Sequence, residues 1–226
     1  MATPYVTISC DEVSSTQDRA AAELQRSGRP VLIVASRQTA GRGRSSNEWW
    51  QAPRAVSASL AFENGLIPVG ETFSLAVGLA VRSALTIETN VDISLKWPND
   101  LELAGDKIGG ILVERDGMRT VVGCGLNLWW PDPPPGVAAL ATTDPGDAIG
   151  LLISEAWASA LIATKGQWNR DAYRGACSTL GEDLTWEPDG RGRAVDVDDR
   201  GGLVVTTRSG EVTLRSGEVQ TVRRTV

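Results

Sequence analysis

The chain has 226 residues, of which 42% are hydrophobic and 22% charged, and its formal net charge is −6. This composition is typical of a globular protein with one large domain, or a medium domain plus a small one, and its acidic balance argues against a general nucleic-acid-binding protein. The sequence contains no histidine, which excludes Ser-His-Asp and Cys-His catalysis and histidine-ligated zinc. Any catalysis must therefore use carboxylates, lysines, arginines and backbone groups.

The first three quarters of the chain mix strands with helices. Residues 14–28 are predicted to form a helix that Ser14 or Ser15 can cap and that Gly28 can end. The remaining elements predicted in this part are strands at 31–36 and 55–62, a strand that runs into a Pro-containing turn at 93–100, an apolar helix at 71–87, a hairpin at 107–128 around Asp116-Gly117, and helices at 148–168 and 169–179. The Pro-, Gly- and Asp-rich segment 129–147 is predicted to be a long surface loop, flexible or partly disordered.

The pattern of apolar and polar residues changes at about Leu180. From there to the C-terminus, short alternating segments are broken by Gly, Asp and Ser, which predicts a meander of β-strands. A segment of about 46 residues buries too little apolar surface to fold stably by itself, so this part should pack on the main domain. We therefore predict an α+β protein with a main domain at 1–179 and a small β domain at 180–226.

The cysteines and the N-terminus indicate where the protein works. Cys10, Cys124 and Cys177 are far apart and show no Cys-x-x-Cys spacing. Their odd number and the lack of a signal-peptide pattern predict free thiols in a reducing compartment, hence a cytoplasmic protein. No apolar run approaches the ~18 residues of a membrane-spanning helix, so we expect no membrane association.

Three short segments suit an anion, and each also has a simpler interpretation. Glycines in "GRGR" (41–44) let backbone N–H groups converge on an anion that arginines can grip, although it could equally be a solvated loop. "KWPND" (96–100) places a lysine and a carboxylate at a strand end, where Asp100 could hold a hydrated cation or merely cap a turn. Lys107 with Gly109-Gly110 enters the hairpin, whose Asn127 offers a donor and an acceptor, but the glycines could form a β-bulge and Asn127 a turn cap.

Taken together, these segments resemble one family. "SSTQD", "QTAGRGRSSNEW", "KWPNDL", "KIGGILVE" and "VVGCGLNL", in this order, resemble the biotin protein ligases, and the C-terminal meander resembles their small SH3-like barrel. The resemblance implies a mixed β-sheet catalytic domain of the class II synthetase-like or biotin-lipoate ligase-like kind. It also implies that MgATP activates biotin to biotinyl-5′-AMP, from which biotin passes to a lysine of a carrier domain.

The resemblance assigns roles to individual residues. It implies biotin contacts for Ser15, Thr16, Gln38, Gly41, Arg42, Lys107 and Gly110. It implies ATP contacts for Arg42, Arg44, Lys107 and Asn127. The residues expected at the reaction centre are Arg44, Lys107, Asp100 and Lys96, with Asp100 orienting Mg²⁺ or the incoming lysine. Two anions must meet in the first step, so fixed cations are required to cancel their repulsion. We expect Trp97 in the core and leave Trp49 open between core and ligand wall.

The sequence departs from its relatives in places. Many carry a third arginine where this chain has Asn47, which puts phosphate binding by that position in doubt. Gln17 stands where relatives often have Asn. Repressor-type members have an additional N-terminal helix-turn-helix domain, so a chain that starts at the catalytic domain is expected to be the short form without DNA binding. The expected partner is the biotin carboxyl carrier domain of an acetyl-CoA or related carboxylase, and the protein itself could be a monomer or a homodimer.

Two rival functions remain at this point. A lipoate–protein ligase shares the implied fold and adenylate chemistry, but "KWPND" with the "GRGR" loop favours biotin. A non-catalytic anion- or RNA-binding module built on the arginine loop belongs to a different class. The net negative charge and the lack of a basic, aromatic-lined face speak against it.

Overall fold

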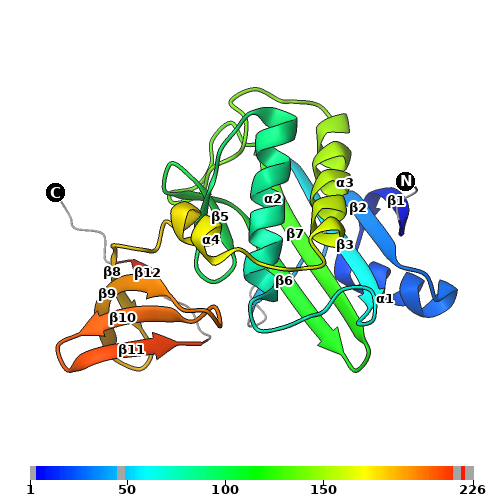
Figure 1. Cartoon of the computed structure of the whole chain (residues 1–226). Helices are drawn as coiled ribbons and strands as arrows, with labels where there is room; N and C mark the ends of the chain where they lie inside the picture. Colours follow the sequence, from blue (N-terminus) through cyan, green and yellow to red (C-terminus); the bar gives the residue numbers. More distant parts are fainter. Residues whose placement is uncertain (1–3, 45–48, 216–219, 222–226) are drawn as a thin grey trace.

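The computed structural model describes residues 4–44, 49–215 and 220–221. A seven-stranded sheet with the order β1-β2-β3-β7-β6-β5-β4 forms the larger part (Figure 1). Its strands are β1 (Val6–Val13), β2 (Val31–Gln38), β3 (Arg54–Glu63), β4 (Ser94–Lys96), β5 (Asp100–Leu103), β6 (Asp106–Asp116) and β7 (Arg119–Trp129). Only β1 and β2 pair in parallel, and the other neighbours are antiparallel. The sheet is therefore mixed, as the sequence predicted.

Helices cover both faces of this sheet, and the strand period of two decides which side chains meet them. Val31 and Ile33 of β2 pack with Leu24 of α1 (Thr16–Ser27) in one apolar cluster. The intervening Leu32 and Val34 belong to the larger core on the other face. Two helices cover that face, α2 (Phe73–Thr89) and α3 (Ala148–Ala163), which pack side by side (Figure 1).

The ends of α1 follow the local signals in the sequence. The side chain of Ser15 accepts a hydrogen bond from the backbone N–H of Asp18, which caps the first turn. Gly28 ends the helix with φ +64°, a left-handed conformation that glycine adopts without steric conflict. The backbone N–H of Ala40 donates to the carbonyl of Ser14 at 2.9 Å, so the start of α1 lies beside the loop that follows β2.

Most predicted elements are confirmed, and two strands were missed. The hairpin of β6 and β7 turns at Gly117, with φ +56°. The strand and Pro-containing turn predicted over 93–100 are confirmed as the short β4 and a turn through Pro98, but the separate strand β5, which begins at Asp100, was not predicted. The sequence analysis also left β1 unassigned. Both missed strands are held mainly by pairing with β2 or β6, a long-range contact that local patterns do not reveal.

The segment after β7 is a loop without helix or strand, as predicted, and its backbone is tied to the sheet. The N–H groups of Ala138 and Leu140 donate to the carbonyls of Lys107 and Asn127 at 2.8 and 2.9 Å. Whether it is also flexible stays a prediction. These bonds hold the loop along the same ends of β6 and β7 that carry Lys107 and Asn127.

The C-terminal part is a five-stranded antiparallel sheet with the order β11-β10-β9-β8-β12. It consists of β8 (Asp183–Trp186), β9 (Gly190–Val197), β10 (Leu203–Thr207), β11 (Gly210–Leu214) and β12 (Gln220–Thr221). Within the described residues the strand pairings do not close the sheet, so an SH3-like barrel stays a prediction, as does the boundary at 179/180.

The two sheets are joined by specific bonds. The short helix α4 (Arg170–Ala176) lies between them, and Arg170 donates to the carbonyl of Val197 at 2.6 Å and to Asp196 at 2.7 Å. The indole N–H of Trp97 donates to the carbonyl of Gly201 at 2.9 Å. Trp97 is 2% exposed, which confirms that it is a core residue. The C-terminal sheet thus contacts the turn that carries Lys96 and Asp100.

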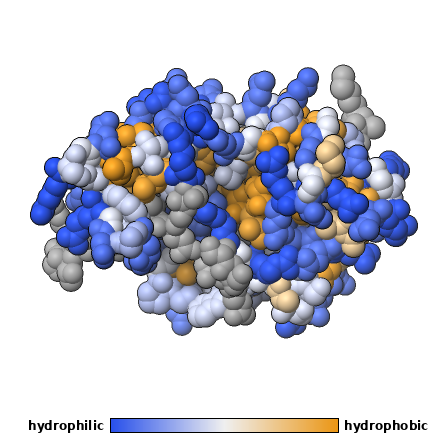
Figure 2. Space-filling model, turned by 90° about the horizontal axis from the view of Figure 1, so that it is seen from below, coloured by the Kyte–Doolittle hydropathy of each residue, from blue (hydrophilic) through white to orange (hydrophobic). Residues whose placement is uncertain are grey.

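The structure also describes the cysteines, the apolar character of the helices and the surface. The three cysteines are free thiols, as predicted. In the ranges that the structure describes, no helix is long and apolar enough to cross a membrane. The face seen in Figure 2 is mostly hydrophilic, with hydrophobic residues reaching the surface in its central part.

Candidate functional site

A cavity of about 330 Å³ lies on the face of the large sheet that α1 covers. The pairing of β3 with β7 explains its position. Ala61 faces Val121, and both pack against α1. Two and four residues further along the same face, Ser59 pairs with Gly123 and Ser57 with Gly125, and all four line the cavity. Beyond the N-terminal start of α1, small residues therefore leave a hollow of a size typical of small-molecule sites.

One end of the cavity consists of neutral hydrogen-bonding groups. Gln38 Oε1 accepts from the backbone N–H and the hydroxyl of Thr16 at 2.7 and 3.0 Å, and Gln38 Nε2 donates to Ser57 Oγ at 3.0 Å. Ser59 Oγ donates to Thr16 Oγ1 at 2.8 Å. These contacts fix the orientation of the Gln38 amide, because its oxygen is held by two donors. We call Thr16, Gln38, Ser57 and Ser59 the polar end.

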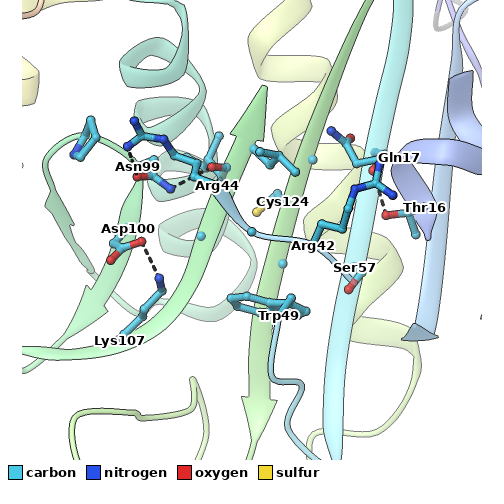
Figure 3. A pocket seen from close by; sticks show the side chains of 18 of the residues that line it. Thr16, Gln17, Arg42, Arg44, Trp49, Ser57, Asn99, Asp100, Lys107 and Cys124 are labelled. Carbon is cyan, nitrogen blue, oxygen red and sulfur yellow. Dashed lines mark hydrogen bonds and ion pairs between the residues drawn. The ribbon is translucent and has the colours of Figure 1, made fainter. Parts of the chain in front are cut away.

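The opposite end carries positive charge (Figure 3). Lys107 Nζ lies 2.6 Å from Asp100 Oδ1, and both side chains are partly exposed. Arg44 Nη1 donates to Asn99 Oδ1 at 3.0 Å, and Asn99 Nδ2 in turn donates to the carbonyl of Ile111. No ion pair of Arg44 with a carboxylate occurs among the described residues. We call Arg44, Asn99, Asp100 and Lys107 the cationic end.

Lys96 supports the cationic end from below the surface. Its Nζ lies 3.6 Å from Glu102 Oε1, and Glu102 is only 7% exposed. Ser178 donates to the other oxygen of this carboxylate at 2.8 Å. Lys96 lines the cavity, and its ion-pair partner Glu102 is more deeply buried than Asp100, the partner of Lys107.

Arg42 lies at the polar end and not with Arg44 (Figure 3). Both of its terminal nitrogens donate to Asp18, each at 2.7 Å, and Nη2 lies 3.5 Å from Glu114 Oε2. Gln17 Nε2 donates to the same Glu114 oxygen at 2.9 Å. The hydrogen bonds from Arg42 lower the pKa of the Asp18 carboxyl, and the Asp18 carboxylate raises the already high pKa of Arg42.

Two adjacent glycines of β6 have different reasons to be glycine. A Cβ on Gly109 would lie 2.5 Å from the carbonyl oxygen of Gly125, so the sheet itself forbids a side chain there. A Cβ on Gly110 would make only ordinary contacts, the nearest being 3.7 Å from Asp100 Oδ1. Gly110 lines the cavity beside the cationic end, so the space that it leaves there is available to a ligand.

Trp49 forms one wall of the cavity. Its indole lies against Gly125, where an added Cβ would come within 2.8 Å of the ring. Its buried Nε1 has no hydrogen-bond partner among the described residues. Trp49 also borders a second hollow that it shares with Gln38 and that Trp50, Ala52 and Trp130 line. The question left open for Trp49 is answered in favour of a wall residue.

The structure brings most of the predicted site residues together. Those that line the cavity are Ser15, Thr16, Gln38, Arg42, Arg44, Lys96, Asp100, Lys107 and Gly110. Gly41 is next to it, since a Cβ at Gly41 would lie 2.9 Å from Gln38 Nε2. Asn47 lies outside the described residues.

Asn127 is placed differently from the other predicted residues. It is 2% exposed and is not among the residues that line the cavity. Its Oδ1 accepts from the backbone N–H of Ala52 at 3.2 Å and its Nδ2 donates to the carbonyl of Ala138 at 3.3 Å. Asn127 therefore ties two loops together beside the second hollow, and a contact with adenine stays a prediction.

Several cavity residues escaped the sequence analysis. Ser57 and Ser59 were read only as polar positions of a strand, although two serines on one face of an otherwise buried strand mark a polar site. Asn99 was seen only as part of a turn, and Gln17 as a departure from relatives. Gln220 reaches the cavity from the C-terminal sheet, and no local signal in the sequence could have revealed this.

A magnesium site built by the protein alone is not supported. In the part of the chain that the structure describes, no group of three or more His, Cys, Asp or Glu side chains could hold a metal ion. Asp100 is the predicted ligand, and it is paired with Lys107. Mg²⁺ commonly binds through one or two carboxylates together with substrate phosphates and water, so Asp100 fits at most a metal that arrives with a nucleotide.

The fold and the site together define an α+β protein with a cavity that carries neutral hydrogen-bonding groups at one end and basic side chains at the other. The chain belongs to the biotin/lipoate A/B protein ligase family, whose model matches residues 10–128. It is 32% identical to the biotin–[acetyl-CoA-carboxylase] ligase of Mycobacterium tuberculosis, over 85% of this chain and 79% of that protein.

Two further comparisons agree with this family. The chain is 38% identical to the bifunctional ligase/repressor BirA of Bacillus subtilis over 52% of its own length, which spans 39% of that protein. The biotin protein ligase of Aquifex aeolicus, solved in complex with biotin and ATP, has a similar structure. The TM-score is 0.79 at 26% identity, covering 97% of this chain and 99% of the other.

Proposed function

We propose that this protein is a biotin protein ligase that activates biotin with ATP and transfers it to a lysine of a biotin carboxyl carrier domain. The observation that carries the proposal is the pairing of a neutral, fully oriented polar end with a cationic end in one cavity. Biotin has the matching halves, a ureido ring with two N–H donors and a carbonyl, and a carboxylate on an apolar chain. Family membership and the similarity to biotin ligases support the same assignment.

The polar end suits the ureido ring. Gln38 and Thr16 are held in fixed orientations by Ser57 and Ser59, so their remaining donors and acceptors are aimed before a ligand arrives. Such preorganisation lowers the entropic cost of binding. The apolar tail would pass Gly110, where the strand leaves space.

The cationic end suits the reaction. In the first step a carboxylate oxygen of biotin attacks the α-phosphorus of ATP, and the bond to pyrophosphate breaks. Both reactants are anions, so Lys107 and Arg44 would stabilise the charge that accumulates between them. Lys107 is partly exposed and held by one carboxylate, so it can exchange Asp100 for the ligand.

In the second step the amine of a carrier lysine attacks the acyl carbon of biotinyl-5′-AMP. The new C–N bond forms as AMP leaves, and the amine gives up its proton. We propose that Asp100, released when Lys107 turns to the ligand, orients the incoming amine or a Mg²⁺ that enters with ATP. Magnesium would supply charge neutralisation on the phosphates. Lys96, paired with buried Glu102, would keep the cationic end in place.

For the nucleotide, we propose that the base enters the second hollow beside Trp49. Tryptophan side chains line it, and an aromatic face offers stacking to a purine. Asn127 lies next to Ala52 on its border, so a small movement could exchange its bond to Ala52 for one to adenine. The acceptor is expected to be the carrier domain of an acetyl-CoA or related acyl-CoA carboxylase, and the protein is proposed to act in the cytoplasm.

The main alternative within the family is lipoate as substrate. The dithiolane ring of lipoate has no hydrogen-bonding groups to match Thr16, Gln38 and Ser57. The donor and acceptor positions that these groups do not use on one another would stay unpaired beside lipoate, and unpaired buried groups disfavour the wrong ligand by a large factor, on the order of 10⁴ in favourable cases. The polar end therefore favours biotin.

Pyrophosphate exchange tests the proposal directly. The enzyme with MgATP and labelled pyrophosphate should form labelled ATP when biotin is added, and not when lipoate is added. A carrier domain should then gain the mass of one biotinyl group, which is biotin less one water. Exchange driven by lipoate would select the alternative, and binding of RNA without any exchange would overturn both.

A further inference from the structure

Two carboxylates of the protein itself, Asp18 and Glu114, face the guanidinium of Arg42. Both of its terminal nitrogens donate a hydrogen bond to the Asp18 carboxylate, at 2.7 Å each, and Glu114 lies 3.5 Å from one of them. Bidentate pairing of this kind is among the stronger charge-assisted arrangements and fixes the plane of the guanidinium. Arg42 would have to give up both bonds to Asp18 before it could neutralise an anion.

Arg44 provides the contrast within the same loop. Its side-chain contact is with the neutral Asn99, at the cationic end, while Arg42 lies on the side of Gln17 and Thr16 (Figure 3). The two arginines of the "GRGR" segment therefore work at different ends of the cavity. Only Arg44 is placed, with Lys107, to meet the reacting anions.

The partners of Arg42 come from two elements that border the polar end. Asp18 belongs to the first turn of α1, directly after Thr16 and Gln17, and Glu114 belongs to β6. Gln17 Nε2 donates to Glu114 at 2.9 Å, so the two carboxylates that face Arg42 are themselves connected. Arg42 thus bridges the loop, the helix and the sheet.

The backbone around Arg42 needs such an anchor. Gly41 and Gly43 flank it, and glycine loses more conformational entropy on ordering than any other residue. Backbone bonds from Thr39 and Ala40 to Val13 and Ser14 hold the start of the loop. Beyond Gly41, the bridge of Arg42 holds the chain where Gly41 approaches Gln38, the centre of the polar end.

We propose that Asp18 is a positioning residue for biotin: with support from Glu114, it holds Arg42 so that the Gly41–Arg44 backbone stays against the polar end. In this assignment Arg42 orders the site and contributes no charge to the reaction. The proposal rests on the proposed function, since biotin is the ligand that the ordered loop would meet. It requires the charge of Asp18 and not only its shape.

The test compares three variants of α1. Asp18→Asn removes the charge and keeps the size, and Asp18→Glu restores a carboxylate. Glu23→Gln is the matched control, because it breaks an ion pair with the exposed Arg26 on the same helix, away from the cavity. We expect Asp18→Asn to raise KM for biotin about tenfold with kcat changed less than about twofold, which is the size expected for one charge-assisted anchor. The KM of Asp18→Glu for biotin should stay within about threefold of the wild-type value, and the KM of Glu23→Gln should equal the wild-type value.

A second measurement needs no catalysis. Hydrogen exchange of the peptide covering residues 37–44, without ligand, should be several-fold faster in Asp18→Asn than in wild type or Glu23→Gln. If Asp18→Asn and Glu23→Gln give the same KM and the same exchange, the positioning role is overturned. Wild-type protein without biotin-dependent pyrophosphate exchange would instead defeat the proposed function, while the hydrogen-exchange comparison would still decide whether Asp18 orders the loop.

Discussion

The two ends of the cavity are built on opposite principles. At the polar end, Thr16, Gln38, Ser57 and Ser59 bond to one another, and the elements that carry them pack on a shared core. At the cationic end, Lys107 and Arg44 hold single partners that a ligand can replace. Recognition of a neutral ring requires fixed donors and acceptors, whereas a reaction between two anions requires charges that can move to the substrate. The predictions below test this division.

The largest effect is expected at Lys107. Lys107→Met removes the ammonium that faces both the cavity and Asp100, so charge in the transition state loses its nearest support. Adenylation, followed by pyrophosphate exchange, should fall by about 10²- to 10³-fold in kcat/KM, as for other lost electrostatic groups. Lys165→Met is the control, because Lys165 is exposed and outside the cavity. A fall of less than about threefold in Lys107→Met would refute the cationic end as the reaction centre.

Arg44→Ala should have a smaller but clear effect on the same step. It removes a guanidinium bonded to Asn99 and leaves no buried charge unpaired. We expect about a 10²-fold loss of pyrophosphate exchange, with binding of the carrier domain nearly unchanged. Exchange kinetics and a direct binding measurement such as calorimetry separate the two. Exchange near the wild-type rate would contradict the role given to Arg44, and Arg208→Ala, in an exposed turn, serves as its control.

At the polar end, Thr16→Val should act on binding and not on chemistry. The substitution keeps the shape but removes the hydroxyl that donates to Gln38 and accepts from Ser59. Two oriented partners lose a contact, so KM for biotin should rise about 10- to 100-fold while kcat and KM for ATP change little. A large loss of kcat at saturating biotin would show that the two ends are not separate in function.

The smallest effect concerns Cys124, which lies between the ends. Burial raises the pKa of its thiol to about 12. The folded protein therefore keeps it protonated and unreactive at pH 8, and iodoacetamide should modify Cys10 first, as read by mass spectrometry. The unfolded chain ionises this thiol near pH 9, so its contribution to stability is present below pH 9 and is lost as pH rises towards 12. Rapid labelling of Cys124 at pH 8 in the folded state would contradict its burial.

Local signals in the sequence predicted much of this protein correctly. Ser15 and Gly28 mark the ends of α1, Asp116-Gly117 marks the hairpin, and the absence of histidine limited the chemistry to charged groups and backbone. These features depend on residues close together in the chain, where backbone conformation and side-chain type act directly. The motifs that carry the family resemblance likewise contain most of the cavity residues.

Only the tertiary structure shows which side chains and strands contact one another. Arg42 and Arg44 are two residues apart and look equivalent in sequence, yet one bonds to Asp18 at the polar end and the other to Asn99 at the cationic end. Strands β1 and β5 exist through pairing with distant strands, and Asn127 is buried because two loops fold over it. The sequence determined which chemical groups are present and where helices and turns begin. Which of those groups meet depends on long-range packing, and no local pattern encodes it.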